Sequence, residues 1–178
     1  MKTVREVCEL ISSVIVDNPV CVETGSTYCD AEDNLIHTTT NNIVDIICAP
    51  KGGKLYSFDV DREHQEIARR LCPDDKTAEF ILGDSVCKLE EWALKGNKVD
   101  LLWLDSKEFD PPHMVNEYNA VRHLLSEKHF VLVDDIHNGN SVKWVEMVPI
   151  LKETGYKYFE IPTPTGLFFS YIGYSIKL

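Results

Sequence analysis

The strongest constraint on the fold is a repeated alternation of short apolar runs with longer, helix-like segments. Each apolar run is too short for a helix of ordinary length and ends close to a carboxylate or a glycine, which is typical of a buried strand. The alternation predicts a mostly parallel sheet with helices on both of its faces. The predicted strands cover residues 20–23, 55–59, 78–82, 99–104 and 130–133.

Helices are expected between these strands. The first is the clearest, because Thr3 and Glu6 form a capping-box pattern and apolar residues follow at helical spacing up to Ile15. Further helices are predicted over residues 37–49 and 63–71, around residues 86–93, from Pro111, and from a Ser141 cap, where Pro149 must bend or split the helix.

The last part of the chain has a different pattern. Residues 156–161 and 167–176 are predicted to form two strands of a hairpin, joined by a turn that contains Pro162, Pro164 and Gly166. No repeat, linker or low-complexity segment divides the 178 residues. We therefore expect one α/β domain, residues 1–178, with a doubly wound, Rossmann-like sheet of about seven strands and an antiparallel C-terminal hairpin strand.

Composition narrows the classes of partner. The formal net charge of −11, with no dense Lys/Arg stripe, disfavours nucleic acid and anionic membrane surfaces as partners. Charged residues interrupt residues 1–10 and the apolar runs are short, so neither a signal peptide nor a membrane span is expected. The six cysteines form no Cys-x-x-Cys pair, and a cytoplasmic location is predicted.

The ligand of such a sheet binds at the carboxyl ends of the strands, where the strand order reverses. Every predicted parallel strand delivers an acidic residue to this rim. These residues are Glu23, Asp59 with Asp61, Asp84, Asp105, and Asp134 with Asp135. The repetition indicates a binding site more strongly than any one of them.

The first turn, Glu23-Thr24-Gly25-Ser26-Thr27, can bring the backbone close to a ligand, but it is equally compatible with an ordinary turn. With Gly25 as its only glycine, it lacks the dinucleotide fingerprint. Asp59 can accept hydrogen bonds from ribose hydroxyls, or it can cap the next helix; Asp61 can cap while Asp59 binds.

Asp105 and the pair Asp134-Asp135 end strands that should be neighbours, about 5 Å apart. Carboxylates this close repel one another unless a proton or a cation lies between them, and oxygen ligands favour Mg²⁺, Mn²⁺ or Ca²⁺. The alternative is that they cap helices and turns. His137 is a candidate general base and His113 a second, although a lone histidine is often a surface or packing residue.

In their order along the chain, the pieces 20–25, 55–59, 83–85, 99–105 and 130–135 resemble the class I S-adenosylmethionine-dependent methyltransferases. The resemblance implies that Glu23, Thr24 and Gly25, with Ser26 beside them, hold the methionine part of the cofactor. It also assigns the ribose, the adenine and the cofactor carboxylate: Asp59 to the ribose, Val60 and Gly83-Asp84-Ser85 to the adenine, and Thr39, from the segment His37-Thr38-Thr39-Thr40, to the carboxylate.

Within that family, Asp105, Asp134 and Asp135 resemble the metal ligands of metal-dependent O-methyltransferases of macrolide sugars and of the cephalosporin-hydroxylase group. There the cation orients substrate hydroxyls, and Asp105 would lie beside both cofactor and metal. The sequence departs from the family at three positions, with Thr27 and Cys29 in place of glycines and Glu108 in place of a histidine.

The expected function is therefore methyl transfer from S-adenosylmethionine to a small-molecule hydroxyl oriented by Mg²⁺ or another hard divalent cation, with His137 and Asp105 as catalytic residues. Since little chain remains for a substrate lid, a homodimer partner would complete the acceptor site. A nucleotide-binding oxidoreductase and a non-catalytic S-adenosylmethionine-binding module are the alternatives.

Overall fold

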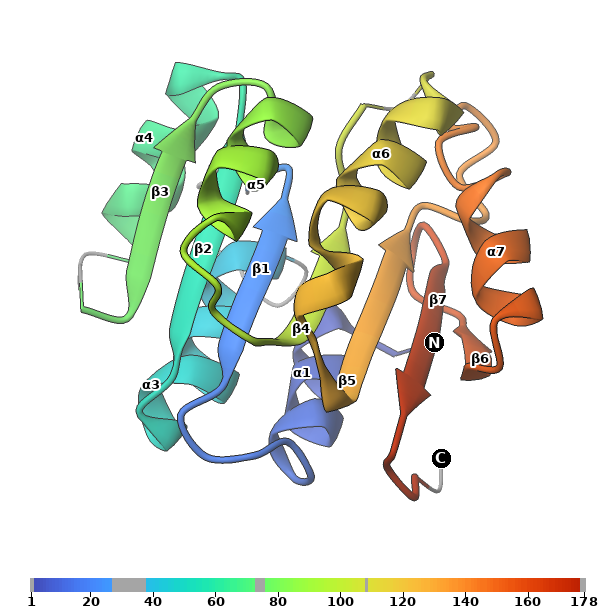
Figure 1. Ribbon diagram of the computed structural model, residues 1–178, viewed down its shortest axis with the longest axis horizontal. Coiled ribbons are helices and arrows are strands. Elements are labelled where there is room, and N and C mark those ends of the chain that lie inside the picture. Colours follow the sequence, from blue (N-terminus) through green and yellow to red (C-terminus); the bar gives the residue numbers. More distant parts are fainter. Residues whose placement is uncertain (1, 27–37, 73–75, 108, 177–178) are drawn as a thin grey trace.

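The computed structural model describes residues 2–26, 38–72, 76–107 and 109–176, and within them the predicted alternation of strands and helices is present (Figure 1). The strands are β1 (Val20–Thr24), β2 (Lys54–Asp59), β3 (Ala78–Leu82), β4 (Val99–Leu104), β5 (Leu125–Asp134), β6 (Lys157–Ile161) and β7 (Leu167–Ile172). The helices are α1 (Val4–Ser12), α2 (Thr39–Asn42), the π-helix η2 (Ile43–Cys48), α3 (Ala49–Lys51), α4 (Arg62–Leu71), α5 (Ser85–Ala93), α6 (Pro111–Val121), the 3₁₀-helix η3 (Arg122–Leu124) and α7 (Met147–Glu153).

The strands form one seven-stranded sheet in the order β3-β2-β1-β4-β5-β7-β6. Strands β1 to β5 pair in parallel, whereas β7 runs antiparallel to both β5 and β6. The order reverses between β1 and β4, which is where a doubly wound sheet binds its ligand. The predicted doubly wound, Rossmann-like sheet with an antiparallel C-terminal hairpin is confirmed.

Two apolar cores lie on opposite faces of the sheet. One contains residues of α1 and η2, such as Ile11 and Ile47, and the other contains residues of α5, α6 and α7, such as Trp92 and Met114. Figure 1 shows α5, α6 and α7 on the near face and α1 and α3 behind the sheet. All six residues of β4 are buried, as expected for a strand covered on both faces.

The local signals at the first helix were accurate. Thr3 caps α1, its hydroxyl accepting a hydrogen bond from the Glu6 amide at 3.1 Å while the Glu6 carboxylate accepts from the Thr3 amide at 2.7 Å. Cys8, Cys21 and Cys48 are buried among apolar residues, as predicted. None of the helices in the described part of the chain is long and apolar enough to cross a membrane.

Several predicted boundaries are wrong. Helix α1 ends at Ser12 and β7 at Ile172, both earlier than predicted, and the segment predicted as one helix divides into α2, η2 and α3. Strand β5 begins at Leu125 rather than at residue 130, because its first half is polar and carries no apolar signal. The predicted helix from Ser141 is absent, and α7 begins only at Met147. Pro149 is the third residue of α7, where the missing amide hydrogen breaks no helical bond, so the helix has to start close to the proline.

A single glycine fixes how the end of β1 meets the end of β4. Gly25 has a φ of +85°, and a Cβ atom placed on it would lie 2.2 Å from the carbonyl oxygen of Asp105. On the other side, the amide of Gly25 donates to the carbonyl oxygen of Phe58 at 2.8 Å. Gly25 is therefore required by the packing of the chain itself, whether or not a ligand approaches it.

We expect Gly25→Ala to lower the free energy of unfolding by about 3 kcal/mol or more, because a backbone clash adds to the cost of a positive φ. Gly96→Ala separates the two effects, since Gly96 has a φ of +72° but open space around it; its cost should be about 1 kcal/mol. Gly139→Ala is the neutral control. Urea unfolding measures all three, and equal losses at Gly25 and Gly96 would contradict the clash.

Candidate functional site

A cavity of about 620 Å³ opens at the carboxyl ends of the parallel strands, a size typical of small-molecule sites. Most of the predicted site residues lie on its wall. These are Gly25, Ser26, Thr39, Asp59, Val60, Asp84, Ser85, Asp105, Asp134 and Asp135. Glu23, Thr24, Gly83 and His137 are not among the wall residues. The predicted positions Thr27, Cys29, His37 and Glu108 lie outside the described residues.

Asp59 ends β2 inside this cavity. Its carboxylate accepts the amide of Ser26 at 2.7 Å and the amide of Asp61 at 2.8 Å, and the residue is 7% exposed. Asp61 accepts from the amides of Glu63 and His64 and so caps α4. The prediction that Asp61 caps the helix is confirmed. Ribose binding by Asp59 stays a prediction.

Glu23 has a different environment from the one its place in the sequence suggested. It is fully buried, and one carboxylate oxygen accepts from the hydroxyls of Ser57 at 2.8 Å and Thr40 at 2.9 Å. The other oxygen, Oε1, has no hydrogen-bond partner among the described residues. Burial raises the pKa of Glu23 to about 8, although both hydroxyl hydrogen bonds lower it. Glu23 thus connects β1 to α2 and β2 beneath the cavity.

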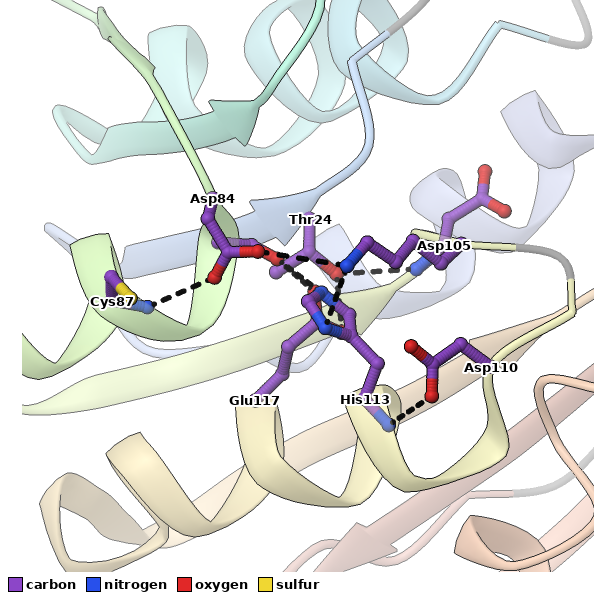
Figure 2. A network of polar contacts seen from close by, with 9 residues as sticks. Thr24, Asp84, Cys87, Asp105, Asp110, His113 and Glu117 are labelled. Carbon is purple, nitrogen blue, oxygen red and sulfur yellow. Dashed lines mark hydrogen bonds and ion pairs between the residues drawn. The ribbon is translucent and has the colours of Figure 1, made fainter.

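A buried polar network lies on the α5–α6 side of the cavity (Figure 2). Glu117, fully buried on α6, accepts from the hydroxyl of Ser85 and, at 3.1 Å, from that of Thr24. His113, one turn earlier, places Nε2 at 2.9 Å from the Ser85 hydroxyl and 3.3 Å from Glu117. The hydrogen bond with Glu117 raises the pKa of His113. A His-x-x-x-Glu pair on one helix face was the sequence signal for this network.

The three carboxylates predicted to bind a metal do gather at the ends of β4 and β5. However, the side-chain ammonium of Lys143 lies between two of them, 2.5 Å from Asp105 Oδ1 and 2.8 Å from Asp135 Oδ2. Asp134 accepts instead from the amide of Asp135 at 2.8 Å and from the Thr165 hydroxyl at 3.2 Å. Burial raises the pKa of Asp134 to about 6, and the charge of Asp135 adds to the rise.

This arrangement does not fit the predicted metal centre. Within the described ranges, no group of three or more His, Cys, Asp or Glu side chains is arranged to hold a metal ion. Two of the three expected ligands already have a cationic partner. A divalent cation at Asp105, Asp134 and Asp135 remains a prediction that the geometry does not support.

His137 does not line the cavity. It is exposed, and its ring packs so closely on Gly166 that a Cβ atom there would be 2.5 Å from the imidazole Cδ2. The second candidate, His113, is on the cavity wall. Thr163 and Thr165, from the turn between β6 and β7, also line the cavity and were not predicted. The turn between β6 and β7 carries no sequence signal for this position.

Comparison with known families agrees with the geometry. The family model described as a methyltransferase domain matches residues 38–136, more than half of the chain. The chain belongs to this family of methyltransferase domains. The match contains the strand-end aspartates 59, 84, 105 and 134 and begins after the turn at Gly25. Membership therefore does not depend on that turn. No functionally curated protein matches the sequence significantly.

Solved structures show the same fold. A methyltransferase from Geobacter sulfurreducens is 15% identical with a TM-score of 0.67, covering 94% of this chain and 77% of its own. A putative methyltransferase from Streptococcus mutans, solved in complex with SAH, is 12% identical with a TM-score of 0.66 and coverages of 96% and 98%. A putative rRNA-methylase from Clostridium thermocellum is 10% identical with a TM-score of 0.66 and coverages of 97% and 97%. With the family match, they identify a class I S-adenosylmethionine-dependent methyltransferase domain.

The buried carboxyl of Glu23 should make stability depend on pH. Its pKa is about 8 in the folded chain and 4.5 ordinarily, so between about pH 5 and pH 8 only the folded chain holds the proton. The free energy of unfolding should therefore fall as pH rises through this window. Glu23→Gln should remove this pH dependence, so that the free energy of unfolding of the variant, relative to the wild type, increases towards pH 8. Urea unfolding across the window measures it.

The exposed Glu153→Gln is the matched control, since it removes the same charge from the surface. Its stability should follow the wild-type pH curve. Parallel curves for Glu23→Gln and the wild type would contradict the assignment of a proton to Glu23.

Proposed function

We propose that this domain transfers a methyl group from S-adenosylmethionine to a hydroxyl group of a small molecule. The observation that carries the proposal is the position of Asp59, a buried carboxylate on the wall of a 620 Å³ cavity where the strand order reverses. The family match and the fold support the class of reaction. When bound, the cofactor supplies an electrophilic methyl group on a positively charged sulfur.

Residues predicted to hold each part of this cofactor line the wall, although Glu23, Thr24 and Gly83 are not among them. The amides of Ser26 and Asp61 hold the Asp59 carboxylate in place, ready to accept hydrogen bonds from vicinal ribose hydroxyls. Val60, next to it, is 69% exposed and gives the wall an apolar surface for the adenine. Asp84 and Ser85 follow at the end of β3, and Gly25 and Thr39 also line the cavity, where they would hold the methionine part.

Negative charge around the cavity favours such a cofactor. Asp59, Asp84, Asp105, Asp134 and Asp135 all line the wall. Lysines pair with Asp84, Asp105 and Asp135, so the carboxylates that remain to attract a sulfonium cation at short range are those of Asp59 and Asp134. With the cofactor bound, the acceptor oxygen would take the methyl group as the bond between carbon and sulfur breaks, and the hydroxyl proton would pass to a base of this chain. His64, His113 and Asp134 are among the wall residues that can accept it.

A small molecule is the acceptor that the charge favours. The net charge of −11 opposes an RNA backbone, even though a structural neighbour is named a putative rRNA-methylase. The oxygen acceptor is what the family resemblance of the sequence implies, and the cytoplasmic location is a prediction. A metal-assisted step is not part of this proposal, because Asp105 and Asp135 already contact Lys143.

Cofactor binding can be tested at Asp59. Asp59→Asn keeps the shape of the side chain but removes its charge, so we expect the affinity for S-adenosylhomocysteine to fall at least about tenfold by calorimetry. Asp17→Asn is the matched control, because Asp17 is 84% exposed and remote from the cavity. Wild-type protein that binds neither S-adenosylmethionine nor S-adenosylhomocysteine would refute the proposal.

Activity assays distinguish a small-molecule methyltransferase from the alternative functions. With methyl-labelled S-adenosylmethionine, label should enter a panel of catechols, sugars and hydroxylated natural products rather than structured RNA. Labelling of RNA alone would contradict a small-molecule acceptor. Tight cofactor binding with no labelled product would indicate a binding module, and saturable binding of NADH in a fluorescence titration would indicate an oxidoreductase instead.

A further inference from the structure

The segment that contains Lys143 buries the opposite side chains from those its hydropathy pattern suggests. On the predicted helix, Val142 and Val145 would face the core, yet they are 43% and 40% exposed, whereas Lys143 is fully buried. A lysine is almost never fully buried unless it is paired, because removing an ammonium from water is costly. Its contacts with Asp105 and Asp135 therefore outweigh the burial of two valines in setting this conformation.

The backbone is shaped to make these contacts. Residues 141–146 form turns instead of a helix, and the Ser141 amide donates to the carbonyl of Asn138 at 2.9 Å. Asp135 has a φ of +62°, a rare conformation for a residue other than glycine, and it directs the chain out of β5. Burial lowers the pKa of Lys143, but the charges of Asp105 and Asp135 raise it well above its usual range, so the side chain stays charged.

From this geometry we propose that the ammonium of Lys143 takes the place of the divalent cation at the ends of β4 and β5, so that the site works without a metal. It joins Asp105, directly after β4, to Asp135, directly after β5, as a bound ion would, and Asp105 thereby keeps a fixed place on the cavity wall. Lys143 is a positioning residue, since it is not on that wall itself. The role of Lys143 in catalysis rests on the proposed function, but the replacement of a metal ion by its ammonium group does not.

A metal would have to displace Lys143 to reach both carboxylates. Mg²⁺ binds carboxylate oxygens at about 2.0–2.1 Å, and the ammonium nitrogen lies within 2.8 Å of one oxygen from each of the two residues. A second cation beside it would also be repelled by the ammonium at short range. Removal of the lysine charge should therefore let a metal ion take its place between Asp105 and Asp135. Asp134 would have to turn away from the Asp135 amide and the Thr165 hydroxyl to join them.

Mn²⁺ binding, followed by electron paramagnetic resonance, tests the inference without any methyl acceptor. The wild type and Lys143→Arg should bind Mn²⁺ only weakly. Lys143→Met should bind one ion, with an affinity at least about tenfold higher than that of the wild type. Mn²⁺ should then raise the melting temperature of Lys143→Met alone. Lys152→Met is the matched control: Lys152 is exposed and pairs with Glu160 on the surface, so its loss should create no site.

The wild-type result is decisive even if Lys143→Met does not fold. One tightly bound Mn²⁺ that is lost in Asp135→Asn would overturn the inference, as would a folded Lys143→Met that binds no Mn²⁺. Chelation by EDTA should leave any wild-type methyl transfer unchanged. If S-adenosylhomocysteine fails to bind while the Mn²⁺ results hold, the proposed function fails and the assignment of Lys143 stands.

Discussion

The structure depends on β1, which pairs in parallel with β2 on one side and with β4 on the other. Backbone hydrogen bonds continue beyond the strand ends: Gly25 donates to Phe58 at 2.8 Å, and Asp105 donates to Thr24 at 3.0 Å. Because Gly25 also approaches the Asp105 carbonyl more closely than any side chain would permit, the ends of three strands are held together. Gly25 and Asp105 both line the cavity, so part of its wall is built on this junction.

Acidic side chains gather at the strand ends, and the cost of burying each carboxylate is offset in a different way. Glu23, fully buried, is held in its protonated form near neutral pH by burial. Asp59 accepts two backbone amides, and Asp105 and Asp135 share Lys143. Removing one partner of such a buried pair is far more damaging than the net stability of the pair suggests, because it leaves a charge out of water without a partner. The arrangement of the site therefore depends on the partners of these carboxylates as much as on the ligand that it would bind.

Most of the fold could be predicted because strand length, capping boxes and turn residues are local signals. Strands β3 and β4 have the predicted bounds, and the Thr3 cap is present as expected. The rim of the cavity followed from parallel pairing, which brings the carboxyl ends of strands to one edge. What could not be predicted depends on contacts between distant residues: the segment around Lys143 has a helical hydropathy pattern, and only the carboxylates of two other strands explain why it is not a helix.

The same reasoning explains why a resemblance in the acidic residues alone was not enough to infer a metal. Carboxylates at the ends of β4 and β5 require a positive charge nearby, but their spacing does not determine whether that charge is an ion or a side chain. The choice depends on residue 143, eight positions after Asp135, in a segment whose own pattern suggests packing. An ion can leave and be replaced, whereas a buried lysine is fixed by the chain. With Lys143 in place, the geometry of Asp105 on the cavity wall becomes a property of the folded protein rather than of its metal content.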